Sequence, residues 1–100
     1  MASSKDYLLY VLELLRNVKD ISYRKMMGEY ILYKSDTIFG GVYDNRFLVK
    51  KTQSAGCFNL KEELPYEGGS KMLLIDSENA EEVEDIVITV CNDLIKDKHK

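Results

Sequence analysis

The feature that most constrains this chain is a change of hydrophobic period along its length. Apolar residues recur at spacings of three and four near both ends, which predicts two amphipathic helices, one over residues 3–18 and one from about residue 77 to residue 96. Between them the period becomes that of β-strands, in short runs separated by polar turns. The predicted strands are residues 23–27, 30–34, 37–43, 46–50 and, after an irregular stretch, 71–75.

The turn residues between these runs predict how the strands connect. Ser35-Asp36 and Asp44-Asn45 stand where two-residue hairpin loops are expected, so successive strands should pair antiparallel as a meander. We therefore predict an α+β fold with two layers, in which an antiparallel meander sheet packs against the N- and C-terminal helices. One hundred residues fit a single domain, residues 1–100.

Two-residue loops also predict which side chains share a face of the sheet. The face expected under the helices is apolar and carries Ile31, Tyr33, Ile38, Gly40, Val42, Phe47 and Val49. The opposite face is expected to carry Tyr30, Leu32, Phe39, Gly41, Tyr43 and Leu48, with basic residues at its margins. A slip of one residue would exchange the two faces.

The opposite face is too apolar to stand bare in water, so it needs a cover. Three covers remain open: residues 51–70 folding back, a second copy of the chain, or another macromolecule. Residues 51–70 show no sustained period and include Pro65, Gly68 and Gly69. This composition predicts either a short helix near residues 53–58 or a loop with a functional task.

Charge is unevenly distributed along the chain. The net charge of -3 argues against nucleic-acid binding by bulk electrostatics. Residues 16–51, however, carry eight basic and four acidic side chains, which leaves the rest of the chain negative by seven. A basic face on the sheet is one interpretation, and solvated strand margins are the other.

Few side chains suggest catalysis. The only histidine, His99, stands in a lysine-rich tail, and Cys57 and Cys91 lie 34 residues apart, which is no zinc-site spacing. We predict no metal, no cofactor and no enzymatic activity, with Cys57 as the nucleophile of a small thiol enzyme kept as an alternative. The absence of a signal segment or a long apolar run, together with two unpaired cysteines, predicts a cytoplasmic protein without membrane contact.

Two runs of residues resemble a known family. Residues 24–33 (RKMMGEYILY) and 39–50 (FGGVYDNRFLVK), followed by residues 64–68 and 72–74, resemble the N-terminal domain of the TfoX/Sxy competence regulators over nearly the whole chain. The residues MMGEYI stand where the family more often has Met-Phe-Gly-Gly-Tyr-Gly, which resembles a divergent subgroup. The resemblance implies a two-layer α+β domain, here standing alone, and a link to expression of DNA-uptake genes. It implies no catalytic residues.

The resemblance and the apolar face together predict a non-enzymatic regulatory or adaptor domain that acts by protein–protein contact through an aromatic and basic sheet face. The partner is either another protein or a second copy in a homodimer. Direct nucleic-acid binding, by aromatic stacking beside cations, is a second hypothesis, and thiol chemistry at Cys57 is a third. The candidate partner-binding residues are Arg24, Lys25, Tyr30, Phe39, Tyr43, Arg46 and Lys50.

Overall fold

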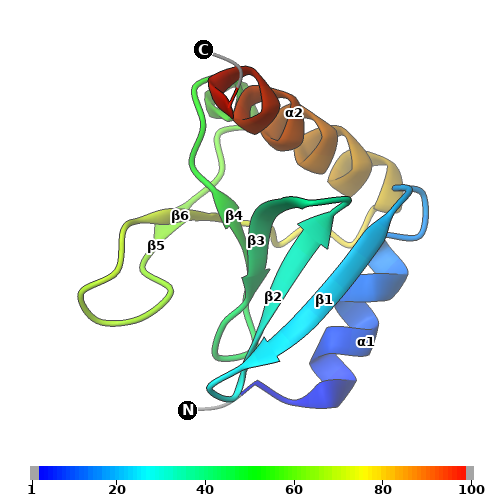
Figure 1. Cartoon of the computed structure of the whole chain (residues 1–100), viewed down its shortest axis with the longest axis vertical. Helices are drawn as coiled ribbons and strands as arrows, with labels where there is room; N and C mark the ends of the chain where they lie inside the picture. The colour runs from blue at the N-terminus through cyan, green and yellow to red at the C-terminus, as the bar shows by residue number, and fades with distance from the viewer. Residues whose placement is uncertain (1–2, 99–100) are drawn as a thin grey trace.

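The computed structural model describes residues 3–98 and confirms the predicted α+β fold (Figure 1). The six strands form one antiparallel sheet in the order β1-β2-β3-β4-β6-β5. The two-residue strand β5 lies inside the stretch predicted to be irregular. The elements are α1 (Lys5–Leu14), β1 (Ile21–Met26), β2 (Glu29–Lys34), β3 (Thr37–Val42), β4 (Phe47–Lys50), the 3₁₀ helix η1 (Ser54–Phe58), β5 (Glu62–Glu63), β6 (Met72–Leu74) and α2 (Ala80–Lys98).

Both α-helices begin at polar caps. The Ser4 hydroxyl accepts a hydrogen bond from the Tyr7 amide at 3.1 Å, and the Asn79 side chain accepts one from the Glu81 amide at 2.8 Å. Helix α1 is shorter than predicted, because the chain leaves the α-helical path after Leu14. The following residues remain packed in the core, so the apolar period continues past the end of the helix.

Two hairpins turn where the sequence predicts, at Ser35-Asp36 and at Asp44-Asn45, whereas the first turns at Met27, which was predicted to end a strand. Asp44 and Asn45 both have positive φ, 52° and 56°, and the residues on either side exchange backbone hydrogen bonds at 2.9 and 3.0 Å. This is the geometry of a two-residue hairpin loop whose twist suits antiparallel strands. The β1–β2 hairpin uses Met27 and Gly28 in the same way, with φ of 52° and 84°.

A β-bulge in β3 makes the predicted face assignment of β2 wrong. The pairs Tyr33↔Ile38 and Val42↔Phe47 have the predicted register, but Ile31 lies opposite Gly41 and not opposite Gly40. The register shifts between Leu32 and Tyr33, so β3 has one more residue than β2 at this point. The extra residue interrupts the regular alternation of β3 side chains between the two faces of the sheet.

The bulge moves Phe39 to the face that the helices cover. Phe39 is fully buried and Tyr30 is 6 % exposed, and both belong to the core that α1 and α2 form with the sheet. Their predicted position on the uncovered face is therefore wrong. We call the helix-covered side the inner face and the other the outer face. Ile38, predicted to lie under the helices, is 38 % exposed on the outer face.

Two adjacent glycines follow the bulge at positions where a side chain would clash with neighbouring atoms. A Cβ at Gly40 would overlap the carbonyl oxygen of Leu48 and lie 2.8 Å from the Cα of Val49. A Cβ at Gly41 would lie 2.8 Å from the ring of Tyr43. Only glycine at position 40 allows β3 to approach β4 this closely. Glycine at position 41 leaves room on the outer face for the ring of Tyr43.

Candidate functional site

Residues 64–71, which connect β5 to β6, fold back over part of the outer face. We call this segment the β5–β6 loop; Figure 1 shows it on the side of the molecule away from α1. Pro65 is buried, and Leu48 on the outer face is fully buried without belonging to the main core. The rings of Tyr43 and Tyr66 lie 6.3 Å apart. Of the three covers left open by the sequence, the structure thus shows the fold-back of the irregular segment.

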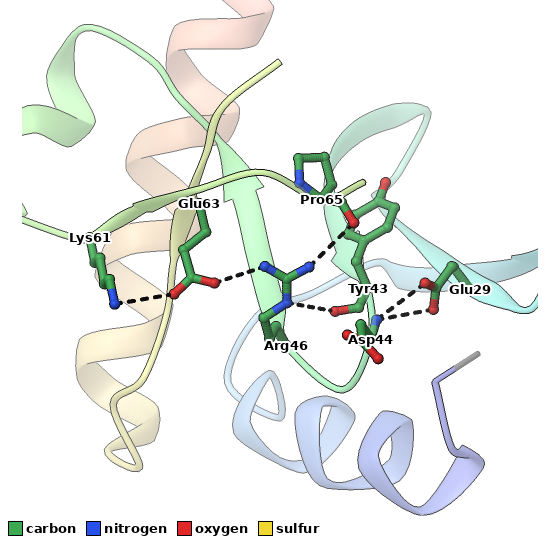
Figure 2. Close-up of polar contacts among 7 residues, drawn as sticks. All are labelled: Glu29, Tyr43, Asp44, Arg46, Lys61, Glu63 and Pro65. Carbon is green, nitrogen blue, oxygen red and sulfur yellow. Dashed lines mark hydrogen bonds and ion pairs between the residues drawn. The ribbon is translucent and has the colours of Figure 1, made fainter. Parts of the chain in front are cut away.

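Arg46 holds the β5–β6 loop to the β3–β4 turn (Figure 2). Its guanidinium donates hydrogen bonds to the Glu63 carboxylate at 2.8 Å, to the Pro65 carbonyl at 3.3 Å and to the Tyr43 carbonyl at 3.2 Å. A planar guanidinium can serve three acceptors at once because its donors point in fixed directions. Arg46 was predicted to bind a partner, and in this structure three of its five N–H donors bind acceptors within the chain.

The ion pair with Arg46 changes the pKa of Glu63. The hydrogen bond from Arg46 lowers the pKa of the Glu63 carboxyl, and the nearby ammonium of Lys61 at 3.7 Å lowers it further. Desolvation acts in the opposite direction, but the pKa of Glu63 is lowered on balance. Glu63 is therefore held in its charged form at neutral pH, and the anchor of the loop stays intact there.

Glu29 fixes the other side of the same turn (Figure 2). Both carboxylate oxygens accept hydrogen bonds from the Asp44 amide at 3.2 Å, and one also accepts from the Ser3 hydroxyl at 2.6 Å. The Asn45 amide in turn donates to the Ser3 oxygen at 3.0 Å. The β3–β4 turn is thus tied to the start of the chain and to β2, which makes it a rigid support for Tyr43 and Arg46.

Tyr43 forms one wall of a cleft on the outer face. Its ring lies over Gly41, as the close approach of the ring to a Cβ at that position shows. Partial burial raises the pKa of Tyr43, and the neighbouring Tyr66 and Glu29 add to the effect. The phenol therefore stays neutral well beyond physiological pH and can donate a hydrogen bond.

The cleft lies between the outer face and the β5–β6 loop and has a volume of about 380 Å³. Three of its residues are lysines and two are tyrosines, so we call it the Lys–Tyr cleft. The ammonium of Lys51 pairs with Glu62 at 3.1 Å, whereas the ion pairs found within residues 3–98 do not include Lys50 or Lys71. Its lining residues are Ile38, Gly40, Tyr43, Lys50, Lys51, Pro65, Tyr66, Ser70, Lys71 and Met72.

This lining suits an anionic group that carries an apolar or aromatic neighbour. The ammonium groups supply charge, the phenol rings supply flat faces, and Ile38 and Met72 supply apolar contact. Its volume lies within the range of pockets that hold a small ligand or the side chains of a bound segment.

The predicted partner-binding residues divide among three places. Tyr43 and Lys50 line the Lys–Tyr cleft, with Arg46 behind it. Arg24 and Lys25 lie exposed on β1, three strands away from β4 in the sheet order. The remaining two, Tyr30 and Phe39, are part of the core.

Sequence reasoning missed the half of the cleft that the β5–β6 loop contributes. Tyr66 is 62 % exposed, and Lys71 stands immediately before β6. The available signal was the irregular stretch of residues 51–70, which predicted a loop with a task but no particular residue. Only the folded position of Pro65 against the sheet brings this tyrosine next to Tyr43.

The remaining chemical candidates lie apart from the cleft. Cys57 is an exposed free thiol on η1 and is not among the residues that line the cleft. Cys91 is buried on α2, and this burial raises its pKa to about 11. Within residues 3–98 no group of three histidine, cysteine, aspartate or glutamate side chains is placed to hold a metal ion, and His99 lies outside that range.

Comparison with protein-family models finds no match to this chain, and comparison with curated protein sequences finds none either. The resemblance to the competence regulators therefore stays a prediction from the residues quoted above. Neither α-helix within residues 3–98 has the length and apolar character that a membrane crossing requires.

Proposed function

We propose that this chain is a non-enzymatic adaptor domain, related to the competence regulators, that binds a partner protein at the Lys–Tyr cleft. The observation that supports this most is the position of three lysines and two tyrosines around one cleft on the face that the helices leave open. Tyrosines that gather on one surface are typical of protein-binding surfaces, and lysines beside them add electrostatic complementarity to an acidic partner.

The cleft favours a partner segment that combines carboxylates with an apolar or aromatic anchor. Lys50 and Lys71 are the cations that carboxylates would meet, since Lys51 is already paired with Glu62. The exposed Tyr66 and the outer-face residue Ile38 would flank the anchor. The net charge of the whole chain is -3, so attraction of an acidic segment depends on this local arrangement and not on overall charge.

Photo-cross-linking from the cleft tests the proposal. A photoreactive phenylalanine analogue replaces Tyr66 in the chain expressed in its native cell, and the adducts are identified by mass spectrometry. We expect one dominant protein adduct whose attachment point lies in a segment rich in Asp or Glu. The double variant Lys50→Glu, Lys71→Glu should reduce its yield about tenfold or more, because it reverses the charge of the cleft.

The matched control is the double variant Arg24→Glu, Lys25→Glu, which makes the same change of charge on β1. This control should leave the adduct at Tyr66 unchanged. Absence of any protein adduct, or an adduct that survives charge reversal in the cleft, contradicts the proposal.

Single-stranded nucleic acid is the second candidate for the same cleft, because tyrosine rings beside lysines can stack bases and neutralise phosphates. Fluorescence anisotropy with a labelled oligonucleotide distinguishes the two. Phosphate contacts make affinity fall steeply between about 50 and 200 mM salt, and the cleft variant should abolish binding. If the oligonucleotide does not bind at low salt, this candidate is excluded.

A further inference from the structure

Strand β1 is an open edge of the sheet. It pairs only with β2, in a continuous register of six residues without a bulge (Figure 1). Five of its six residues are exposed, and it contains no proline. Of the usual protections of an edge, short length, bulges and proline are absent from β1, and the charged side chains of Arg24 and Lys25 oppose pairing only with a strand of like charge. At the opposite edge β5 is only two residues long.

Alternate residues of β1 direct their backbone groups away from the sheet. In an antiparallel pair, hydrogen-bonded positions alternate along each strand. The Ser35 amide donates to the Asp20 carbonyl at 2.8 Å, one residue before β1 begins. By this alternation Ile21, Tyr23 and Lys25 are the residues whose amides and carbonyls point outward, where another strand could pair with them.

The side chains along this edge are basic and aromatic. The ring of Tyr23, beside the open edge, packs edge-on against Tyr30, with the ring centroids 5.9 Å apart. Arg24 and Lys25 are exposed, and neither takes part in the ion pairs found among residues 3–98. Met26 and Met27 add apolar surface at the end of the strand, 48 % and 98 % exposed.

We propose that the β1 edge binds an extended acidic segment of a partner protein, which adds to the sheet as a further strand. The backbone of Ile21, Tyr23 and Lys25 would supply the hydrogen bonds, and carboxylates of the segment would pair with Arg24 and Lys25. This binding mode takes affinity from the backbone and specificity from alternate side chains. A second copy of the chain is a poorer occupant, because antiparallel pairing of β1 with itself gathers four cations along one strand pair.

A short peptide of the repeat Glu-Glu-Val-Val is the probe, because it carries carboxylates on both faces of a strand and so can meet both Arg24 and Lys25. Amide hydrogen exchange of the labelled chain is followed by NMR as the peptide is added. When the chain is saturated with peptide, we expect the amides of Ile21, Tyr23 and Lys25 to exchange at least about tenfold more slowly. The exchange rates of the Ser22 and Arg24 amides should change little. A peptide with the same side chains but N-methylated throughout should give no protection, because it cannot donate to the outward carbonyls of β1 and its methyl groups obstruct strand pairing.

Two double variants locate the binding. Arg24→Glu, Lys25→Glu should weaken the peptide about tenfold or more, whereas Lys50→Glu, Lys71→Glu in the Lys–Tyr cleft should leave its affinity unchanged. Circular dichroism of both variants checks that the fold is kept. Loss of binding only in the cleft variant, equal binding of the N-methylated peptide, or no protection of the outward amides each overturns the proposal. Protection already present in the free chain, with dimers in sedimentation, overturns it in favour of a second copy.

Discussion

Alanine substitution of two neighbouring residues, Phe39 and Ile38, distinguishes the bulged register from the uniform one. In the structure Phe39 is fully buried among the helices, whereas Ile38 is 38 % exposed on the outer face. In a uniform register the two residues would exchange environments, because neighbouring side chains of a strand point to opposite faces. The same change at adjacent positions should therefore have very different effects.

The expected magnitudes follow from burial. Removal of a fully buried phenylalanine side chain lowers the free energy of unfolding by about 3–5 kcal/mol, a large part of the roughly 5–15 kcal/mol that a domain commonly has. Ile38→Ala removes apolar atoms that are already partly in water, which lowers it by no more than about 1.5 kcal/mol. At about 4–8 °C per kcal/mol for a chain of this size, Phe39→Ala should lower Tm by at least about 12 °C.

Thermal and urea unfolding followed by circular dichroism measure both variants against the unchanged chain. The two transitions should have the same cooperativity, so that midpoints compare directly. Equal destabilisation by the two variants, or a larger effect of Ile38→Ala, would falsify the bulged register and with it the placement of the Lys–Tyr cleft.

Three further predictions test the glycines, the thiols and one carboxylate. Gly40→Ala should destabilise by about 1–3 kcal/mol in urea, because its Cβ overlaps the backbone of β4, whereas Gly56→Ala, with open space around it, should change stability by less than about 0.5 kcal/mol; equal effects refute the close approach. In a thiol titration at pH 8, Cys57 should react in the native chain and Cys91 only after unfolding, because burial raises the Cys91 pKa to about 11; two rapid native thiols refute this. Hydrogen bonds from Ser54, at the start of η1, lower the pKa of Asp93. Its charge therefore stabilises the fold at neutral pH, and this contribution fades as pH falls through the lowered pKa. The stability lost in Asp93→Asn should shrink from pH 7 to pH 3, and a constant or growing loss counts against it.

The resemblance to the competence regulators and the choice of partner stay predictions. The edge and cleft experiments test the two proposed contact surfaces separately. Charge reversal on β1 and charge reversal in the cleft serve as controls for each other. A chain that loses peptide binding at one surface and keeps cross-linking at the other has two independent contacts. If each charge-reversal variant removes both peptide binding and cross-linking, one partner spans the two surfaces, or the variant has disturbed the fold, which circular dichroism would reveal.

The order and type of most elements could be predicted from local signals. Ser4 and Asn79 cap the helices, and Asp44-Asn45 turns the hairpin, because each acts on backbone groups within a few residues of itself. The candidate site was only partly predictable. Tyr43 and Lys50 were identified from the strand pattern, but Tyr66 was not, since no periodicity in a loop shows which strand it will lie against.

The amino-acid sequence by itself determined the two helices, the antiparallel meander and the turns, since hydrophobic period and backbone preference act within a few residues. Tertiary packing alone decided which face Phe39 occupies and where the β5–β6 loop lies. The close approach of β3 to β4 requires glycine at position 40, and the position of the loop depends on Arg46 reaching Glu63, seventeen residues along the chain. Contacts between distant residues are set by the shape of the whole core, and no local pattern records them.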